Sequence, residues 1–241
     1  EIRFCDWSSD VCSSDLQAGF VASANVLGSA LGGLVAVFTV KRLAWRRVAL
    51  LALVVLIAFD LVSMRVTSAD ALLVLRFAHG LVGGLLVGTG YSLIARTPSA
   101  DRAFGMLFLL QFSLGGLMVA ILPTLVTSWG VGVLFLTLIA FSAVTIAILP
   151  FIPDLPVRAG AAPIADTIVD TGGVARPWHR IPWFYAALLA VFLFQAANMG
   201  LLAFAIGLGK AFGHTIGFTS RALGVAQWTA IVGPLLVIAR F

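Results

Sequence analysis

The sequence predicts an all-α fold, a polytopic bundle in which about seven helices span a membrane. Three observations predict it: long apolar stretches, few charges, and basic residues gathered in alternate loops. Of the 241 residues, 61% are hydrophobic and 10% are charged, whereas about 25% of the residues of a soluble domain are charged. A helix needs roughly 20 residues to cross the hydrocarbon layer, and lipid offers free backbone groups no partners. The predicted transmembrane helices are residues 17–40, 48–66, 71–94, 103–124, 130–149, 182–208 and 222–241.

Residues 1–16 are polar and precede the first apolar stretch. They contain both cysteines, Cys5 and Cys12, and no apolar signal region. Residues 6–16 resemble the translation of a sequencing-library adapter, so we interpret 1–16 as an artefactual tail; the alternative is a genuine polar N-terminus. Without this tail no cysteine remains, so the rest of the sequence offers neither disulfides nor thiol ligands for a metal.

Residues 150–181 interrupt the apolar pattern and are predicted to form a linker. Six of the nine prolines lie between residues 150 and 182, and proline removes a backbone donor and ends helices. The linker separates an N-terminal bundle of five helices at 17–149 from the start of a second bundle, two helices at 182–241. Two helix bundles joined in this way are the plan of a transporter.

Basic residues in the loops predict the orientation. The loop after the first predicted helix holds Lys41, Arg42, Arg46 and Arg47. Over all loops and helix ends, ten Lys and Arg residues lie on this side of the membrane and three on the other. Because cytoplasmic loops carry the excess of Lys and Arg, this basic loop and the linker are predicted to be cytoplasmic. The chain is then a multi-pass protein of a bacterial cytoplasmic (inner) membrane.

The third predicted helix carries one arginine and three glycines at a spacing of four. Arg76 is followed by Gly80, Gly84 and Gly88, and residues four apart share a face of a helix. Glycines on one face let a neighbouring backbone come close, so these three are predicted helix-packing residues. An arginine inside the membrane costs at least ~2.5–3.5 kcal/mol on insertion scales. We therefore expect Arg76 to have a partner or to face a water-filled cavity.

This Arg-x3-Gly-x3-Gly arrangement resembles the fourth-helix motif of the major facilitator superfamily. The basic loop is similar to the family's loop between helices two and three, and the linker falls where the family joins its two halves. The resemblance covers residues 17–241 and implies a secondary active transporter that moves a small solute by alternating access. It also implies that the seven helices are family helices two to eight, so that helix one and helices nine to twelve are missing from a truncated fragment.

The few polar side chains within the predicted helices are the candidates for substrate binding or ion coupling. Asp60 and Arg76 each lie about six residues from the outer turn, roughly 9 Å deep, and can form an ion pair across the hairpin. Alternatively, Arg76 faces the cavity and contacts an anionic substrate or a proton-coupling acid. His79, one turn further along, can titrate near neutral pH. Three side-chain amides complete the candidates: Gln195 and Asn198 in the sixth predicted helix and Gln111 in the fourth.

The sequence favours a transporter over an enzyme. It contains no H-E-x-x-H pattern and no phosphate loop, and His79, His179 and His214 lie in separate segments. We expect no catalytic residue, no metal and no cofactor. The expected partners are a small-molecule solute, with protons as the candidate coupling ion, and the lipid bilayer, but no nucleic acid. The alternatives are a polytopic channel, or a membrane enzyme or assembly protein without transport.

Overall fold

The computed structural model describes residues 15–39, 44–66, 68–97, 99–152 and 205–240, with short pieces at 167–169, 175–177, 183, 185–187, 189–190 and 193. These residues fall into two compact units. The first unit contains the helices up to residue 152 and those from residue 216 onward, and the second contains the pieces between residues 167 and 211. Residues 1–14 of the predicted tail lie outside the described residues.

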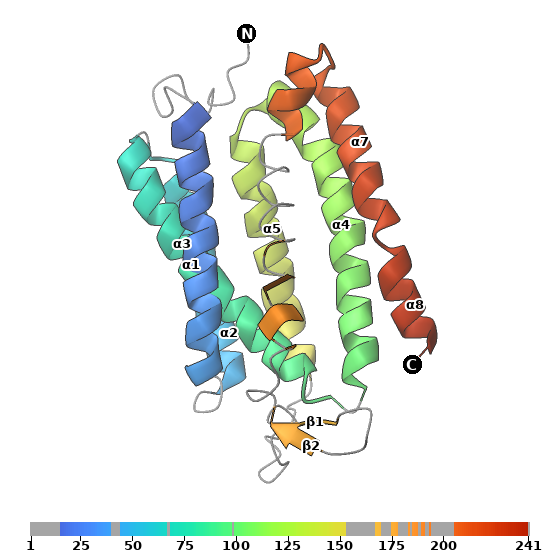
Figure 1. Ribbon diagram of the computed structural model, residues 1–241. Coiled ribbons are helices and arrows are strands. Elements are labelled where there is room, and N and C mark those ends of the chain that lie inside the picture. The colour runs from blue at the N-terminus through green and yellow to red at the C-terminus, as the bar shows by residue number, and fades with distance from the viewer. Residues whose placement is uncertain are drawn as a thin grey trace. The chain divides into compact units, whose positions relative to one another are not determined.

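The first unit is built of helices (Figure 1). They are α1 (Asp15–Thr39), α2 (Trp45–Ser63), α3 (Ala69–Ile94), α4 (Ala100–Trp129), α5 (Gly132–Ile148), the 3-10 helix η1 (Leu149–Phe151), α7 (Ile216–Thr229) and α8 (Val232–Arg240). In the described part of the chain, five helical stretches are long and apolar enough to cross a membrane: Gly19–Thr39, Ala69–Ile94, Ala100–Trp129, Gly132–Phe151 and Ile216–Arg240. The prediction of an all-α membrane bundle is confirmed for this unit.

The helix α2 is not among those five stretches, although it is continuous. It has 19 residues, and Arg46, Arg47 and Asp60 place three charges within them. The two arginines belong to the first turn of the helix, whereas the apolar stretch predicted from the sequence begins at residue 48. Side chains of arginine at a helix end can extend to the membrane surface, so these two charges are compatible with a spanning helix.

The observed helices begin earlier than the predicted apolar stretches where a polar residue caps the first turn. The helix α3 begins at Ala69, two residues before the predicted stretch, because the hydroxyl of Ser68 accepts a hydrogen bond from the backbone N–H of Ala71 at 3.5 Å. The helix α7 begins at Ile216, six residues before the predicted stretch, because Thr215 Oγ1 accepts from the backbone N–H of Phe218 at 3.2 Å. Such N-caps satisfy donors that the first helical turn leaves free.

The predicted helix 222–241 is interrupted by a turn at residues 230–231, between α7 and α8. The backbone N–H groups of Ala230 and Ile231 bond to carbonyls three residues back, at Gln227 and Trp228. Pro234 follows, and its nitrogen cannot donate to the carbonyl of Ala230, so the regular helical bonding is lost at this point.

The second unit contains a short β-ribbon that the linker prediction lacked. β1 (Thr167–Val169) pairs antiparallel with β2 (Ala175–Pro177), with Ile168 opposite Arg176. The three residues of β1 are all β-branched, which favours extended backbone. In the predicted helix 182–208, the described positions 183, 185–187, 189, 190, 193 and 205–208 are helical; the others lie outside the described residues.

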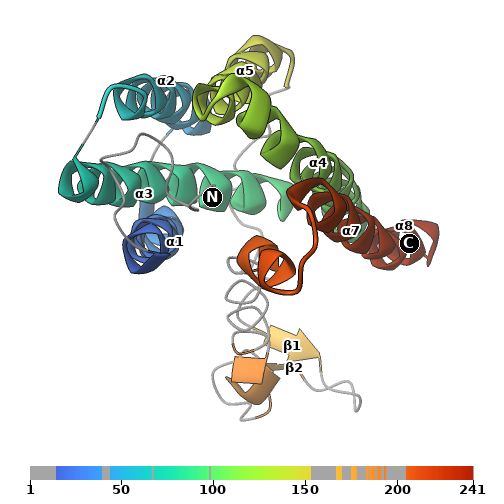
Figure 2. The ribbon, with the colours of Figure 1, turned by 90° about the horizontal axis from the view of Figure 1, so that it is seen from above.

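The helices α1 and α3 are joined by a seam of four glycines, Gly28 and Gly32 in α1 and Gly80 and Gly84 in α3. A Cβ atom added to any of the four would overlap a backbone carbonyl oxygen of the facing helix. The two backbones therefore touch directly, which side chains larger than hydrogen would prevent. Elsewhere in this unit, α2 packs against both α3 and α5, and α4 packs against α7 and α8 (Figure 2).

Candidate functional site: a buried charge cluster on α2 and α3

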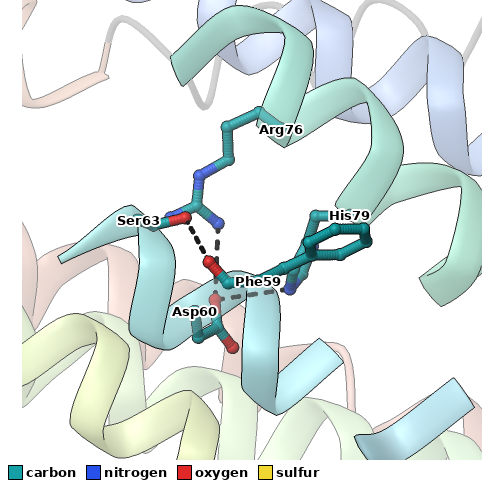
Figure 3. Close-up of polar contacts among 5 residues, drawn as sticks. All are labelled: Phe59, Asp60, Ser63, Arg76 and His79. Carbon is teal, nitrogen blue, oxygen red and sulfur yellow. Dashed lines mark hydrogen bonds and ion pairs between the residues drawn. The ribbon is translucent and has the colours of Figure 1, made fainter. Parts of the chain in front are cut away.

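Asp60 is the centre of a charge cluster between α2 and α3. Its side chain is 1% exposed, and its Oδ1 atom lies 3.7 Å from Arg76 Nη1 and 3.4 Å from His79 Nε2 (Figure 3). The side chains of Arg76 and His79 are 10% and 16% exposed. One carboxylate oxygen is thus shared by a guanidinium and an imidazole.

Neither contact of Asp60 is a hydrogen bond; the contact with Arg76 is an ion pair, and the contact with His79 is one only when the imidazole is protonated. Among the described residues Asp60 Oδ1 has no hydrogen-bond partner, and both distances exceed the usual 2.7–3.2 Å of an N–H···O bond. A buried carboxylate is stable only when an opposite charge offsets its loss of hydration. The attraction between Arg76 and Asp60 is therefore one of charge rather than of a directed hydrogen bond.

Local helix geometry brings the three residues together. Arg76 and His79 are three residues apart on α3, a spacing that places side chains side by side on a helix. Asp60 lies three residues before the end of α2 and Arg76 seven residues after the start of α3. Measured along the helix axes from these ends, the two residues lie roughly 5 Å and 10 Å into their helices, and their equal depth in the membrane stays a prediction.

Arg76 also contacts an aromatic ring from α5. Its Cζ atom lies 4.8 Å from the centre of the Phe135 ring, and Phe135 is buried, with 5% of its surface exposed. A cation over the face of an aromatic ring within about 6 Å is attracted by the ring's negative face. The guanidinium is therefore in contact with groups from α2 and α5, while its own backbone belongs to α3.

Arg76 and the glycines that follow it contact different helices. Consecutive helical residues are about 100° apart, so each step of four turns the face by about 40°. Gly80 and Gly84 consequently lie against α1, whereas Arg76 reaches Asp60 on α2. Gly88 is at the end of the series, where a Cβ would come within 2.5 Å of the Ala36 Cβ. The three glycines thus all face α1, and only Arg76 is directed toward α2.

Among the described residues, none of the other predicted candidates joins the cluster. Gln111 is exposed on α4. Arg46 donates from Nη2 to the backbone carbonyl of Ile152, linking the start of α2 to the end of η1, and Arg47 is exposed. Lys41, Arg42, Gln195 and Asn198 lie outside the described residues.

Phe135 was not a candidate in the sequence, and neither were two polar residues of the α4–α7 contact. Trp228 donates from Nε1 to the backbone carbonyl of Ser113 at 3.1 Å, and Ser220 is fully buried. Phe135 lies in a run of apolar residues where nothing distinguishes one phenylalanine from the next. Gly116 of α4 and Gly224 of α7 approach each other here. A search of the sequence for glycines that allow close helix packing could have identified this contact.

Comparison with known proteins identifies the family. The chain matches the model of the Major Facilitator Superfamily over residues 6–241. No curated protein and no solved structure is a significant match. The match spans both units and all of the helices described above. The family match and the apolar helices together identify the chain as an integral multi-pass membrane protein. The match also favours a transporter over an enzyme. The chain therefore belongs to the major facilitator superfamily, whose members carry small solutes across membranes.

Proposed function

We propose that the protein is a secondary active transporter that moves a small solute by alternating access, and that Asp60, Arg76 and His79 couple this movement to protons. The observation that carries the proposal is the shared oxygen of Asp60, which lies within 4 Å of both the Arg76 guanidinium and the His79 imidazole. Charged residues inside a membrane are costly and are usually retained for a task. Family membership supports transport, and the cluster supports an ion-coupled form of it.

The chemistry of the cluster suggests how coupling works. Arg76 alone balances the charge of Asp60, so a third group with a variable charge is not required for stability. Histidine is the side chain whose charge changes most readily near neutral pH. When His79 carries a proton, it competes with Arg76 for the same carboxylate oxygen, and the guanidinium becomes available to an anionic group of the solute. When His79 is neutral, Arg76 returns to Asp60.

Solute-driven proton movement tests this proposal. The full-length protein is reconstituted into vesicles that contain a pH-sensitive dye, and a panel of sugars, amino acids, organic anions and organic cations is added in turn. We expect at least one solute to produce saturable uptake together with proton movement. His79→Gln should keep solute exchange and lose the proton movement, because glutamine has the polarity but not the titratable charge. His214→Gln, at an exposed position, is the control.

Three other results would contradict the proposal. Current that rises in proportion to voltage without saturation would indicate a channel. Turnover of a compound without its movement across the membrane would indicate an enzyme. Unchanged proton movement in His79→Gln, with transport intact, would leave the transporter assignment standing and exclude His79 from coupling.

We also propose that the loop before α2 faces the cytoplasm, in a bacterial cytoplasmic membrane. The support is the excess of Lys and Arg on this side, ten against three. Cysteine at Ala44 is compared with cysteine at Met64, in the exposed turn after α2, after Cys5 and Cys12 are replaced by serine. In intact cells, a membrane-impermeant thiol reagent should label position 64 and not position 44. The reverse pattern would overturn the orientation.

A further inference from the structure

Among the described residues, Arg76 has one charged and one aromatic contact on other helices. Asp60 attracts the guanidinium from α2 at 3.7 Å, and the Phe135 ring lies beneath it from α5 at 4.8 Å. We propose that Phe135 is a positioning residue for Arg76: the face of its ring holds the guanidinium beside Asp60.

The distances explain why a second restraint is needed. A hydrogen-bonded arginine–carboxylate pair is fixed by the direction of its bonds, often two in parallel. The Arg76–Asp60 contact is too long for such a bond, so charge attraction alone would leave the long side chain free to turn. The attraction of the ring face for the guanidinium limits how far the side chain can turn away. Phe135 is suited to this because it is itself buried, at 5% exposure.

Because Phe135 belongs to α5, its contact with Arg76 connects α5 to the charge cluster. α2 packs against α3 and also against α5, and the Arg76 side chain links all three helices through its two contacts. The α5 sequence Gly132–Ile148 contains no charged residue, so α5 influences the cluster through the ring and not through a charge. A shift of α5 relative to α3 would therefore release Arg76 without changing any charge.

This inference deepens the proposed function and rests on it for any effect on transport. The positioning itself can be measured on the protein alone, without a solute. Failure of transport and failure of the positioning contact are therefore distinguishable.

A series of fluorinated phenylalanines at position 135 tests the contact. Fluorine atoms withdraw electron density from the ring face and so weaken its attraction for a cation, while the ring keeps nearly the same size. The full chain in lipid nanodiscs is compared with mono-, di- and trifluorinated Phe135. We expect a stepwise fall in Tm, about 2–8 °C in total. We also expect a stepwise shift in the infrared bands of arginine labelled with carbon-13 in the guanidinium.

Natural substitutions complete the test. Phe135→Tyr and Phe135→Trp keep an aromatic face and should leave the guanidinium bands near their original frequencies, whereas Phe135→Leu should shift them. Phe141→Leu is the matched control, because Phe141 lies on the same helix and is 41% exposed. In an Arg76→Ala background, fluorination should have no effect on Tm. Equal Tm values and unchanged guanidinium bands across the fluorinated series would overturn the proposal and leave Phe135 as a packing residue.

Discussion

Arg76→Ala should abolish transport and destabilise the protein by about 3–5 kcal/mol, because it leaves the Asp60 carboxylate buried without its permanent partner. Asp60 is 1% exposed, so water cannot replace the guanidinium. Thermal unfolding in nanodiscs measures the stability, and solute uptake into vesicles measures the transport.

The double variant Asp60→Asn with Arg76→Ala separates the structural role of the pair from its role in coupling. It removes both charges, so most of the lost stability should return, because no buried charge is left unpaired. Transport should remain absent if the cluster couples solute to protons. Arg221→Ala, at an exposed position on α7, is the control and should change neither property. Recovery of transport in the double variant would show that the pair is structural only, and normal transport by Arg76→Ala alone would contradict both roles.

Gly84→Ala should destabilise the protein by about 1–3 kcal/mol, whereas the same change at the adjacent Gly83 should stabilise it slightly. A Cβ at Gly84 would overlap the backbone carbonyl of Ser29 in α1, so the two helices must move apart. A Cβ at Gly83 would meet nothing within 4 Å. Alanine is a better helix former than glycine by roughly 0.5–1 kcal/mol, and at Gly83 this gain is not opposed by a clash.

Paired thermal unfolding of Gly84→Ala and Gly83→Ala checks this difference, since the two variants share the same composition and helix. Crosslinking between cysteines placed across α1 and α3 would report separation of the helices in Gly84→Ala only. Similar Tm values for the two variants would mean that the seam of glycines tolerates an extra carbon, and that the close approach of α1 and α3 is not required for stability.

Much of the fold could be predicted because lipid imposes strong limits on a chain. An apolar stretch of about 20 residues has to form a helix to satisfy its backbone in lipid, and each of the first five predicted stretches lies mainly in one helix. Helix ends were less accurate because hydropathy does not register caps such as Ser68 and Thr215. The break before Pro234 was missed for a similar reason, since it changes hydrogen bonding and not hydropathy.

The candidate site could be predicted only in part. Asp60, Arg76 and His79 were identifiable because a charge in an apolar stretch is rare and costly. Their spacing along α3 also indicated that Arg76 and His79 lie close together. It could not indicate that both approach a single oxygen of Asp60, because that depends on the rotation of α2 about its own axis.

The membrane helices, the charged residues within them and the glycine spacing can all be predicted from composition and from the 3.6-residue period of a helix. The helix that each side chain meets depends instead on how the helices pack. Gly80 and Gly84 lie against α1, Arg76 turns toward Asp60 on α2, and Phe135 of α5 completes its surroundings. The physical reason is that helix rotation and crossing depend on how whole surfaces pack, which the period of a single helix does not contain.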